Sequence, residues 1–217
     1  MPTSSMTDPS AGDTLAALWR RIECWTAAQA PQWLGLGGAY PLFNASASAS
    51  SLDQLETRLG LVLPPAYRAL LRCHDGCRAG DYPLPMRATA PTAWRTLAAA
   101  EVGPIWERLC ALAADRPYPH GIRTEGPVRA QWWNRGWIPA ATAGTGDLVC
   151  VDTDPAPGGA PAQLLLYEHD FAERRRLFPS LVDWLRECAD DLEGGAYAYV
   201  DGLGLCLPTA DDDPAPG

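Results

Sequence analysis

The feature that most constrains the fold of this chain is a change in hydrophobic spacing near Pro117. Before it, apolar residues recur at helical intervals, beginning with the amphipathic stretch 15–25. After it come short β-prone runs separated by turn residues, at 137–138, 148–151, 163–167 and 175–178. Helical spacing returns after Ser180, where Asp183 completes a capping box. This order predicts a single α+β domain, in which N-terminal helices pack on a mainly antiparallel sheet and a C-terminal helix closes the fold.

Capping and breaking residues predict where individual helices begin and end. Asp13 is expected to be the N-cap of the first helix, and Ser51 with Gln54 forms a capping box for the second. Gly103-Pro104 is expected to break the helical stretch 94–112, because proline removes a backbone donor. The Gly/Ala/Ser-rich segment 35–51 is expected to be a loop.

The length of 217 residues with 47% hydrophobic content is sufficient for a substantial core. We expect a domain over residues 14–207, between a flexible N-terminal tail (1–13) and an acidic, proline-rich tail (208–217). No apolar run approaches the roughly 18–20 residues of a membrane span, and the N-terminus lacks signal-peptide features. The seven cysteines indicate reduced thiols, so a cytoplasmic protein is expected.

The negative charge is concentrated near the C-terminus. Residues 183–213 hold nine acidic residues and one arginine, which accounts for −8 of the net charge of −9. An acidic chain repels phosphate, so this balance excludes a protein that binds nucleic acid through bulk charge. A solvated helix face followed by an acidic tail would explain the charge without any partner.

Several motifs follow one another in a fixed order. The tryptophan-containing first helix is followed by Leu-Gly-x-x-Leu-Pro-x-x-Tyr-Arg (59–68), His-Asp-Gly (74–76), Trp-Trp-Asn-Arg-Gly-Trp-Ile-Pro (132–139) and Gly-Asp-Leu-Val-Cys-Val-Asp (146–152). In order and spacing, residues 15–197 resemble the SUKH superfamily. Its members include bacterial immunity proteins that neutralise toxins and fungal regulators of cell-wall assembly. The resemblance implies a fold that works by binding proteins.

Three features depart from the family pattern. Ala162 stands where the family usually has glycine before Gln163, so we expect any departure from the family structure here to affect the local turn and not the fold. The segments 77–91 and 198–207 differ in length from those of compact members.

The tryptophans of the segment 132–139 have two interpretations. With Arg129 and Arg135 beside them, they could stack on a base or a sugar. Alternatively, they fill the space between the sheet and the helices, as buried tryptophans commonly do. Because neighbours on a strand face opposite ways, we expect either Trp132 or Trp133 to be exposed, where it would be a hot spot for a protein partner.

Two groups of carboxylates could also contact a partner. Asp147, Asp152 and Asp154 surround a predicted strand, and the last two point to one face, which suits a cation or a partner's arginine. Turn capping is the alternative. The second group lies at the end of the closing helix, where negative charge opposes the helix dipole and hints at a role outside folding: Asp190, Asp191 and Glu193.

The sequence gives little support for an enzyme. The segment Cys73-His74-Asp75-Gly76-Cys77 lacks the second ligand pair that a structural zinc needs. Adjacent His169 and Asp170 cannot easily orient each other as a catalytic pair, and no phosphate-binding glycine loop follows a strand. We therefore expect no catalytic residue, no metal and no cofactor.

The resemblance implies an immunity protein, a non-catalytic binder that occludes the active site of a cognate toxin. The acidic charge suits a basic, nucleic-acid-targeting toxin, and neither nucleic acid nor membrane is an expected partner. The alternatives are a regulatory scaffold like the fungal relatives and a small-molecule sensor that uses the tryptophans. The residues expected to contact the toxin are Trp132, Trp133, Arg135, Asp147, Asp152, Asp154, Asp190, Asp191 and Glu193.

Overall fold

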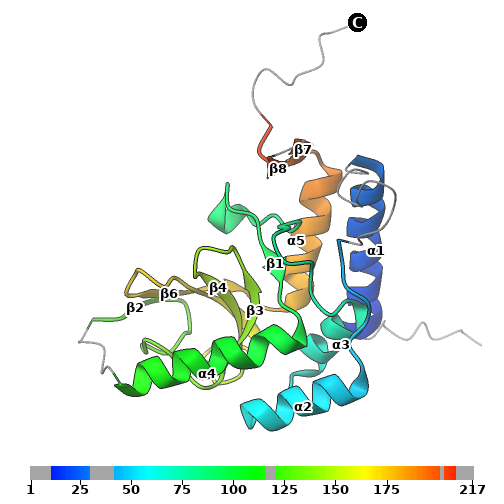
Figure 1. Ribbon diagram of the computed structural model, residues 1–217. Coiled ribbons are helices and arrows are strands. Elements are labelled where there is room, and N and C mark those ends of the chain that lie inside the picture. The colour runs from blue at the N-terminus through cyan, green and yellow to red at the C-terminus, as the bar shows by residue number, and fades with distance from the viewer. Residues whose placement is uncertain (1–10, 30–41, 116–120, 201–202, 209–217) are drawn as a thin grey trace, which may run out of the picture.

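The computed structural model describes residues 11–29, 42–115, 121–200 and 203–208 (Figure 1). The first helices precede the sheet along the chain and a long helix follows it. The helices are α1 (Ala11–Gln29), α2 (Ala49–Leu59), α3 (Pro65–Cys73), α4 (Ala99–Asp115) and α5 (Leu181–Glu193), with a short 3-10 helix, η2, at Arg87–Thr89. Among these, no helix is both long and apolar enough to cross a bilayer.

A six-stranded sheet has the strand order β1-β3-β4-β5-β6-β2. Its central strands are β3 (Trp137–Thr142), β4 (Leu148–Asp152), β5 (Gln163–Tyr167) and β6 (Glu173–Phe178). Each pairs antiparallel with the next, which confirms the predicted α+β fold with a mainly antiparallel sheet.

Two short strands at the edges of the sheet were not expected. At one edge, β1 (Arg95–Thr96) pairs with β3, and at the other, β2 (Arg123–Glu125) pairs with β6 in parallel. β1 has two residues and β2 is exposed throughout, so neither shows the alternation that marks a strand in a sequence. A separate two-stranded sheet follows α5, made of β7 (Ala198–Val200) and β8 (Gly204–Cys206).

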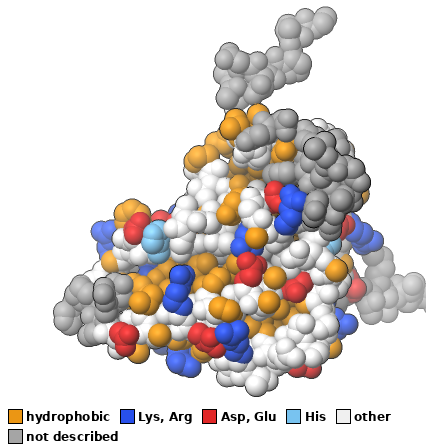
Figure 2. Space-filling model, in the orientation of Figure 1, with side chains coloured by type: hydrophobic (Ala, Val, Ile, Leu, Met, Phe, Trp, Pro, Cys, Tyr) orange, Lys and Arg blue, Asp and Glu red, His pale blue; other side chains and the backbone are white. Residues whose placement is uncertain are grey.

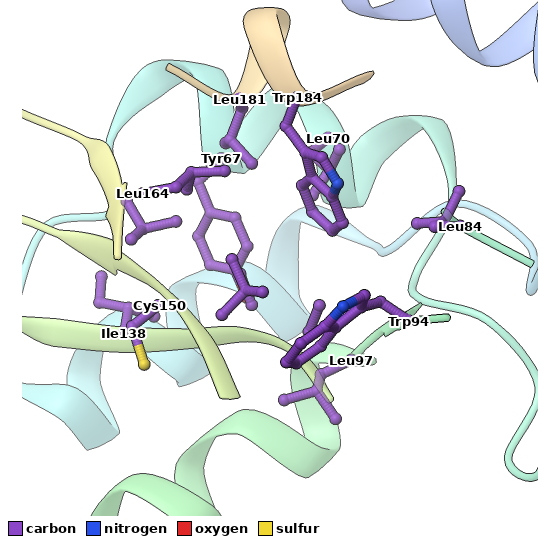
Figure 3. Packing of buried hydrophobic residues seen from close by; sticks show 14 of the residues in the cluster. Tyr67, Leu70, Leu84, Trp94, Leu97, Ile138, Cys150, Leu164, Leu181 and Trp184 are labelled. Atoms are coloured by element: carbon purple, nitrogen blue, oxygen red, sulfur yellow. The ribbon is translucent and has the colours of Figure 1, made fainter. Parts of the chain in front are cut away.

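The core joins the sheet to the helices around it. In Figure 3, Tyr67 of α3 and Leu181 and Trp184 of α5 gather on one side of the strands that carry Ile138 and Leu164. Tyr67 is fully buried, and its hydroxyl donates to the carbonyl oxygen of Pro139 at 3.1 Å. Beyond this layer, α1 packs along α5 and α3, while α2 packs against α4 (Figure 1).

The prediction that Gly103-Pro104 interrupts a helix is wrong, because α4 runs through both residues. Gly103 has no Cβ to clash with the ring of Pro104, which relieves the usual restriction on the residue before a proline. The same position allows a close approach of Arg58, since a Cβ on Gly103 would lie 2.6 Å from Arg58 Cδ. Trp94 is not helical and instead lies in an isolated antiparallel bridge to Leu84.

The expected helix starts were correct for α5 and displaced for α1 and α2. At α5, Ser180 Oγ accepts from Asp183 N at 3.2 Å, which confirms the predicted cap. α1 begins at Ala11, so Asp13 lies in its first turn instead of capping it, and residues 11–13 are helical. α2 is capped by Ser48, whose Oγ accepts from Ser51 N at 3.0 Å. Several serines precede α2, and the sequence does not distinguish which one caps it.

Parts of the expected tails and of the expected loop lie outside the described residues, at 1–10, 35–41 and 209–217.

The turn at Ala162 keeps its geometry although alanine replaces the expected glycine. Gln163 N donates to the Ala160 carbonyl oxygen at 3.1 Å, Pro161 follows Ala160, and the φ angle of Ala162 is 65°. These are the features of a type II turn, whose third residue needs a positive φ and is usually glycine. Alanine is therefore held in left-handed backbone at this corner.

Candidate partner-binding surface

The two adjacent tryptophans lie in the loop before β3, so the strand argument for exposing one of them does not apply. Trp133 is buried, with its ring centroid 5.3 Å from that of Tyr167 and 5.8 Å from that of Trp137. Trp132 is half-buried and meets Tyr167 edge to face at 5.6 Å. The interpretation that tryptophans fill space thus describes Trp133 and Trp137, and Trp132 keeps only part of its surface accessible.

A buried arginine that sequence reasoning missed fixes this loop. The guanidinium of Arg174 lies 4.2 Å from the ring centroid of Tyr167, opposite which it pairs in the sheet. Its Nη2 donates to the Trp132 carbonyl oxygen at 2.9 Å, and its Nη1 donates to that of Phe171 at 2.9 Å. Arg174 is the first of three consecutive arginines, a pattern typical of a solvated strand, and nothing in that pattern marks one of them as buried.

Arg135 is the most accessible residue of the tryptophan-rich segment. It is exposed, and its guanidinium carbon lies 4.8 Å from the ring centroid of Trp106 on α4. Trp106 Nε1 also donates to the Arg135 carbonyl oxygen at 2.9 Å. The stacked position limits the motion of the side chain while its charge faces solvent, which suits contact with a partner.

Asp152 cannot reach a partner, because its side chain is fully buried. Its oxygens accept from Gln163 Nε2 at 2.9 Å and from Asp154 N at 3.0 Å. Burial raises the pKa of Asp152 despite these hydrogen bonds. The second Gln163 contact, from Nε2 to the Pro127 carbonyl oxygen at 2.9 Å, joins the end of β4 to the loop before the tryptophans. Asp152 therefore holds the scaffold together.

Asp154 is half-exposed and ties the tryptophan loop to the end of β4. Its carboxylate accepts from Asn134 Nδ2 at 3.0 Å and from Arg129 Nη2 at 2.7 Å, and these hydrogen bonds lower the pKa of Asp154. Gly136 lies against this carboxylate, since a Cβ there would be 2.8 Å from Asp154 Cβ. Turn capping, the alternative to a shared binding face, describes Asp152 and Asp154 better, because their carboxylates serve different neighbours.

Asp147 lies at the opposite end of β4 and holds the β5–β6 turn. Its carboxylate accepts from the backbone nitrogen of His169 at 3.0 Å and contacts His169 Nδ1 at 2.9 Å. Partial burial opposes ionisation of Asp147, but hydrogen bonds from His169 outweigh it and lower the pKa of Asp147. The hydrogen bond to Asp147 in turn raises the pKa of His169, which Asp170 also faces at 3.1 Å. The pair is a contact between two turns on the surface.

The acids at the end of α5 have structural partners, so their position against the helix dipole no longer calls for an outside role. Arg21 of α1 donates to Asp190 at 2.7 Å and to Glu193 Oε1 at 2.9 Å, which ties α1 to α5. Asp191 is buried and pairs with Arg87. Asp190 and Glu193 keep exposed oxygens that a partner could still reach, whereas Asp191 does not.

The segment Cys73-His74-Asp75-Gly76-Cys77 is a packing hub. His74 pairs with Glu23 of α1, and its Nδ1 lies 2.9 Å from the Asn44 carbonyl oxygen. Asp75 accepts from Ala99 N at 2.7 Å and so caps the start of α4. Within the described residues, no group of three or more histidine, cysteine or acidic side chains is arranged to hold a metal ion.

Comparison with known proteins assigns the fold to a family. A model of the SMI1 / KNR4 family (SUKH-1) matches residues 46–187, well over half of the chain. The chain belongs to this family.

Curated relatives of this SUKH-1 chain are fungal proteins. It is 25% identical over 189 residues to the cell wall biosynthesis/cell cycle regulator smi1 of Schizosaccharomyces pombe, covering 82% of the chain and 36% of the relative. It is 31% identical over 74 residues to the cell wall assembly regulator SMI1 of Saccharomyces cerevisiae, covering 34% of the chain and 15% of the relative. A KNR4/SMI1 homolog of Kluyveromyces lactis is 32% identical over 74 residues, 34% of the chain and 14% of the relative. The longest of these matches, to the Schizosaccharomyces pombe regulator, thus spans little more than a third of that protein.

The family match covers α2 to most of α5 and leaves α1, β7 and β8 outside it. The candidate residues from Trp132 to Asp154 lie inside the match, at the end of β4 or on loops beside its two ends. Asp190, Asp191 and Glu193 lie just beyond it. The SUKH-1 scaffold therefore carries the expected contact residues in three separate places instead of one cluster.

Proposed function

We propose that this SUKH-1 protein is a non-catalytic binder that neutralises a cognate bacterial toxin by covering the toxin's active site. The observation that carries the proposal is that side chains able to act in catalysis are instead bound to partners within the fold. Asp147 holds His169, Asp152 holds Gln163, and Asp191 holds Arg87. Groups committed to the scaffold in this way favour a protein that acts through its surface.

The charge distribution supports a basic partner. Most of the net charge of −9 lies in residues 183–213, and the exposed oxygens of Asp190 and Glu193 belong to that stretch. Negative charge gathered in one region steers a basic partner to it and raises the association rate at low salt. Of the residues expected to contact the toxin, those with accessible atoms are Trp132, Arg135, Asp147, Asp154, Asp190 and Glu193.

The test mixes the purified protein with the product of an adjacent toxin-like gene. We expect a complex on size-exclusion chromatography and loss of toxin activity at equimolar ratio. Arg135→Ala is expected to weaken the complex, whereas Arg20→Ala, an exposed arginine on α1, serves as the matched control. Absence of a complex between the parent proteins refutes the proposal.

A regulatory scaffold is the second candidate, favoured by the names of the fungal relatives and by the 82% of this chain that the Schizosaccharomyces pombe regulator matches. Under this alternative, the chain would replace the matching region of that regulator. Expression of such a chimera in cells lacking the regulator should restore growth under cell-wall stress. Failure of the chimera, with the unaltered regulator restoring growth, refutes this candidate.

A further inference from the structure

The strand β2 leaves one edge of the main sheet open. All three of its residues are exposed: Arg123, Thr124 and Glu125. At the opposite edge, the carbonyl oxygen of Thr96 on β1 accepts from Cys77 N at 2.9 Å, so the chain itself covers that edge. Figure 1 shows β2 on the outer side of β6, away from α1 and α5. An open edge offers backbone groups to which another strand can be added.

The backbone of Thr124 faces this open edge. β2 runs parallel to β6, and Arg123 N donates to the Ala172 carbonyl oxygen at 2.8 Å, so the backbone groups of Arg123 are directed toward β6. Because successive residues of a paired strand direct their backbone groups to opposite sides, those of Thr124 are directed away from β6. An antiparallel strand with a residue directly opposite Thr124 would exchange two hydrogen bonds with it.

The side chains of β2 match a reversed copy of the same strand. Arg123 and Glu125 lie on one face of the strand, and Thr124 lies on the other. When two β2 strands pair antiparallel with Thr124 opposite Thr124, Arg123 of each copy meets Glu125 of the other. Cross-strand pairs of opposite charge and Thr–Thr pairs both stabilise antiparallel sheets.

β6 extends this charge pattern. The register places Arg123 beside Glu173 and Glu125 beside Arg175. Two joined copies would therefore have rows that alternate in charge across four strands, in the order Glu173, Arg123, Glu125 and Arg175. Arg123 Nη2 lies 3.4 Å from Glu173 Oε2, and its side chain is 81% exposed. A guanidinium has five donors, so Arg123 can serve the carboxylates on both sides of it. Figure 2 shows basic and acidic side chains side by side at the end of the molecule where Figure 1 places β2 and β6.

Other arrangements of two β2 strands bring like charges together. A parallel pair in register places Arg123 opposite Arg123 and Glu125 opposite Glu125. An antiparallel pair centred on either of these residues places that residue opposite itself. Charge on a short edge strand commonly prevents pairing, but here it opposes these arrangements and favours the one centred on Thr124. The charge pattern thus indicates a second copy of this chain, in one orientation and one register.

We propose that β2 is a self-association edge, through which two copies of this chain join their sheets by antiparallel pairing about a two-fold axis at Thr124. Both copies use the same surface, as in other dimers of this symmetry. The inference goes beyond the proposed function and does not depend on it, because Arg135 and the acids of α5 lie on other elements. A contact of three residues per copy is short, so the association is weak and requires high protein concentration.

The first experiment follows self-association of the whole chain by sedimentation velocity. We expect the parent to shift from monomer toward dimer between about 10 μM and about 1 mM, with added salt weakening the dimer because the charges are exposed. Thr124→Pro removes the outward N–H group, and proline is tolerated at a sheet edge, so this variant should fold and remain monomeric. Thr124→Val keeps the N–H group and the β-branched shape, so it is the matched control and should still dimerise.

Two outcomes of this experiment overturn the inference. One is a parent that remains monomeric at about 1 mM. The other is a dimer that Thr124→Pro weakens by less than about tenfold. Circular dichroism of Thr124→Pro should match that of the parent, since the residue is exposed.

The second experiment tests the register by reversing charges. Arg123→Glu and Glu125→Arg each place like charges opposite each other in both rows of their own dimer, so each variant alone should self-associate at least about tenfold more weakly than the parent. An equimolar mixture restores opposite charges in both rows. With one variant labelled, the mixture should therefore form a heterodimer at concentrations where each variant alone is monomeric. A mixture no more associated than its separate components overturns the register and the inference.

A strand of another protein is the competing occupant. The probe is the toxin-like gene product, titrated into the parent and into Thr124→Pro. Binding that Thr124→Pro weakens at least about tenfold, with a parent that is monomeric at about 1 mM, would assign the edge to that partner and overturn the second copy. Equal binding by both proteins, with a parent that dimerises, supports the second copy and leaves the proposed function intact.

Discussion

Replacing Ala162 by glycine is expected to stabilise the protein, against the usual effect of that substitution. The φ angle of Ala162 is 65°, in the left-handed region where a Cβ crowds the following carbonyl oxygen. The same φ of 65° occurs at Gly60, where a glycine already ends α2. The two positions share a backbone conformation and differ in residue, so each is the control for the other.

The magnitude follows from three opposing contributions. Relief of left-handed strain favours glycine by about 1–2 kcal/mol. Greater freedom of glycine in the unfolded chain opposes it by about 0.4–1 kcal/mol. The half-buried methyl group of Ala162 contributes less than the ~0.8 kcal/mol of a fully buried one. The net gain expected for Ala162→Gly is therefore about 0.5 kcal/mol.

Urea unfolding followed by tryptophan fluorescence measures this gain, with two matched variants beside it. Gly60→Ala should destabilise, since it adds strain in open space where a Cβ meets no atom within 4 Å. Ala111→Gly, at an exposed position within α4, should cost about 1 kcal/mol. The two Ala→Gly variants should thus differ by about 1.5 kcal/mol, or roughly 3–6 °C in melting temperature. Equal destabilisation by both would refute the assignment of strain to Ala162.

Three further perturbations test the contacts of the candidate surface. Asp147 raises the pKa of His169, so the protonated histidine stabilises the folded state. This contribution is present below the ordinary pKa of histidine and is lost as the pH rises through the higher pKa of the folded state. His169→Ala should therefore lower the melting temperature more near pH 5.5 than near pH 8.5, and an equal loss at both would contradict this. Arg174→Met removes the buried donor to the carbonyl oxygens of Trp132 and Phe171. It should lower the free energy of unfolding, measured in urea, by about 3 kcal/mol. A loss below about 1 kcal/mol would contradict the contacts described. Arg87→Ala leaves the carboxylate of Asp191 buried without its partner, so it should lower the urea midpoint. Arg123→Ala is the control and should lower the midpoint less, because the Arg123 side chain is 81% exposed. Adding Asp191→Asn to Arg87→Ala should recover part of the loss.

Most of the fold could be predicted from hydrophobic periodicity and helix-capping residues. The runs that became β3 to β6 alternate with clear turns, and the Ser180 cap of α5 follows from residues adjacent in sequence. The unbroken α4 did not follow, because a proline within a helical stretch usually ends the helix. The close approach of Arg58 from α2 to Gly103 also lies beyond any local rule. Local rules locate an element well when its signals are local.

The candidate site was predicted less well because charge pairing joins residues far apart in the sequence. The acids at the end of α5 look unpaired in the sequence, yet Asp190 and Glu193 meet Arg21 from the first helix and Asp191 meets Arg87 from a long loop. Burial of Trp133, which lies in a loop, likewise depends on Tyr167 of β5. The departure at Ala162 was visible in the sequence, but only the φ angle showed that the turn kept its geometry.

The packing of α1 along α5 has a consequence for synthesis of the chain on the ribosome. α1 ends at Gln29, whereas α5, which together with α3 covers its buried face, is complete only at Glu193. At roughly 5–20 residues per second, the first helix waits on the order of ten to thirty seconds for its partner. Throughout that interval the part of its apolar face that α5 covers is open to other nascent chains and to chaperones, so α1 is fully enclosed only long after it has been made.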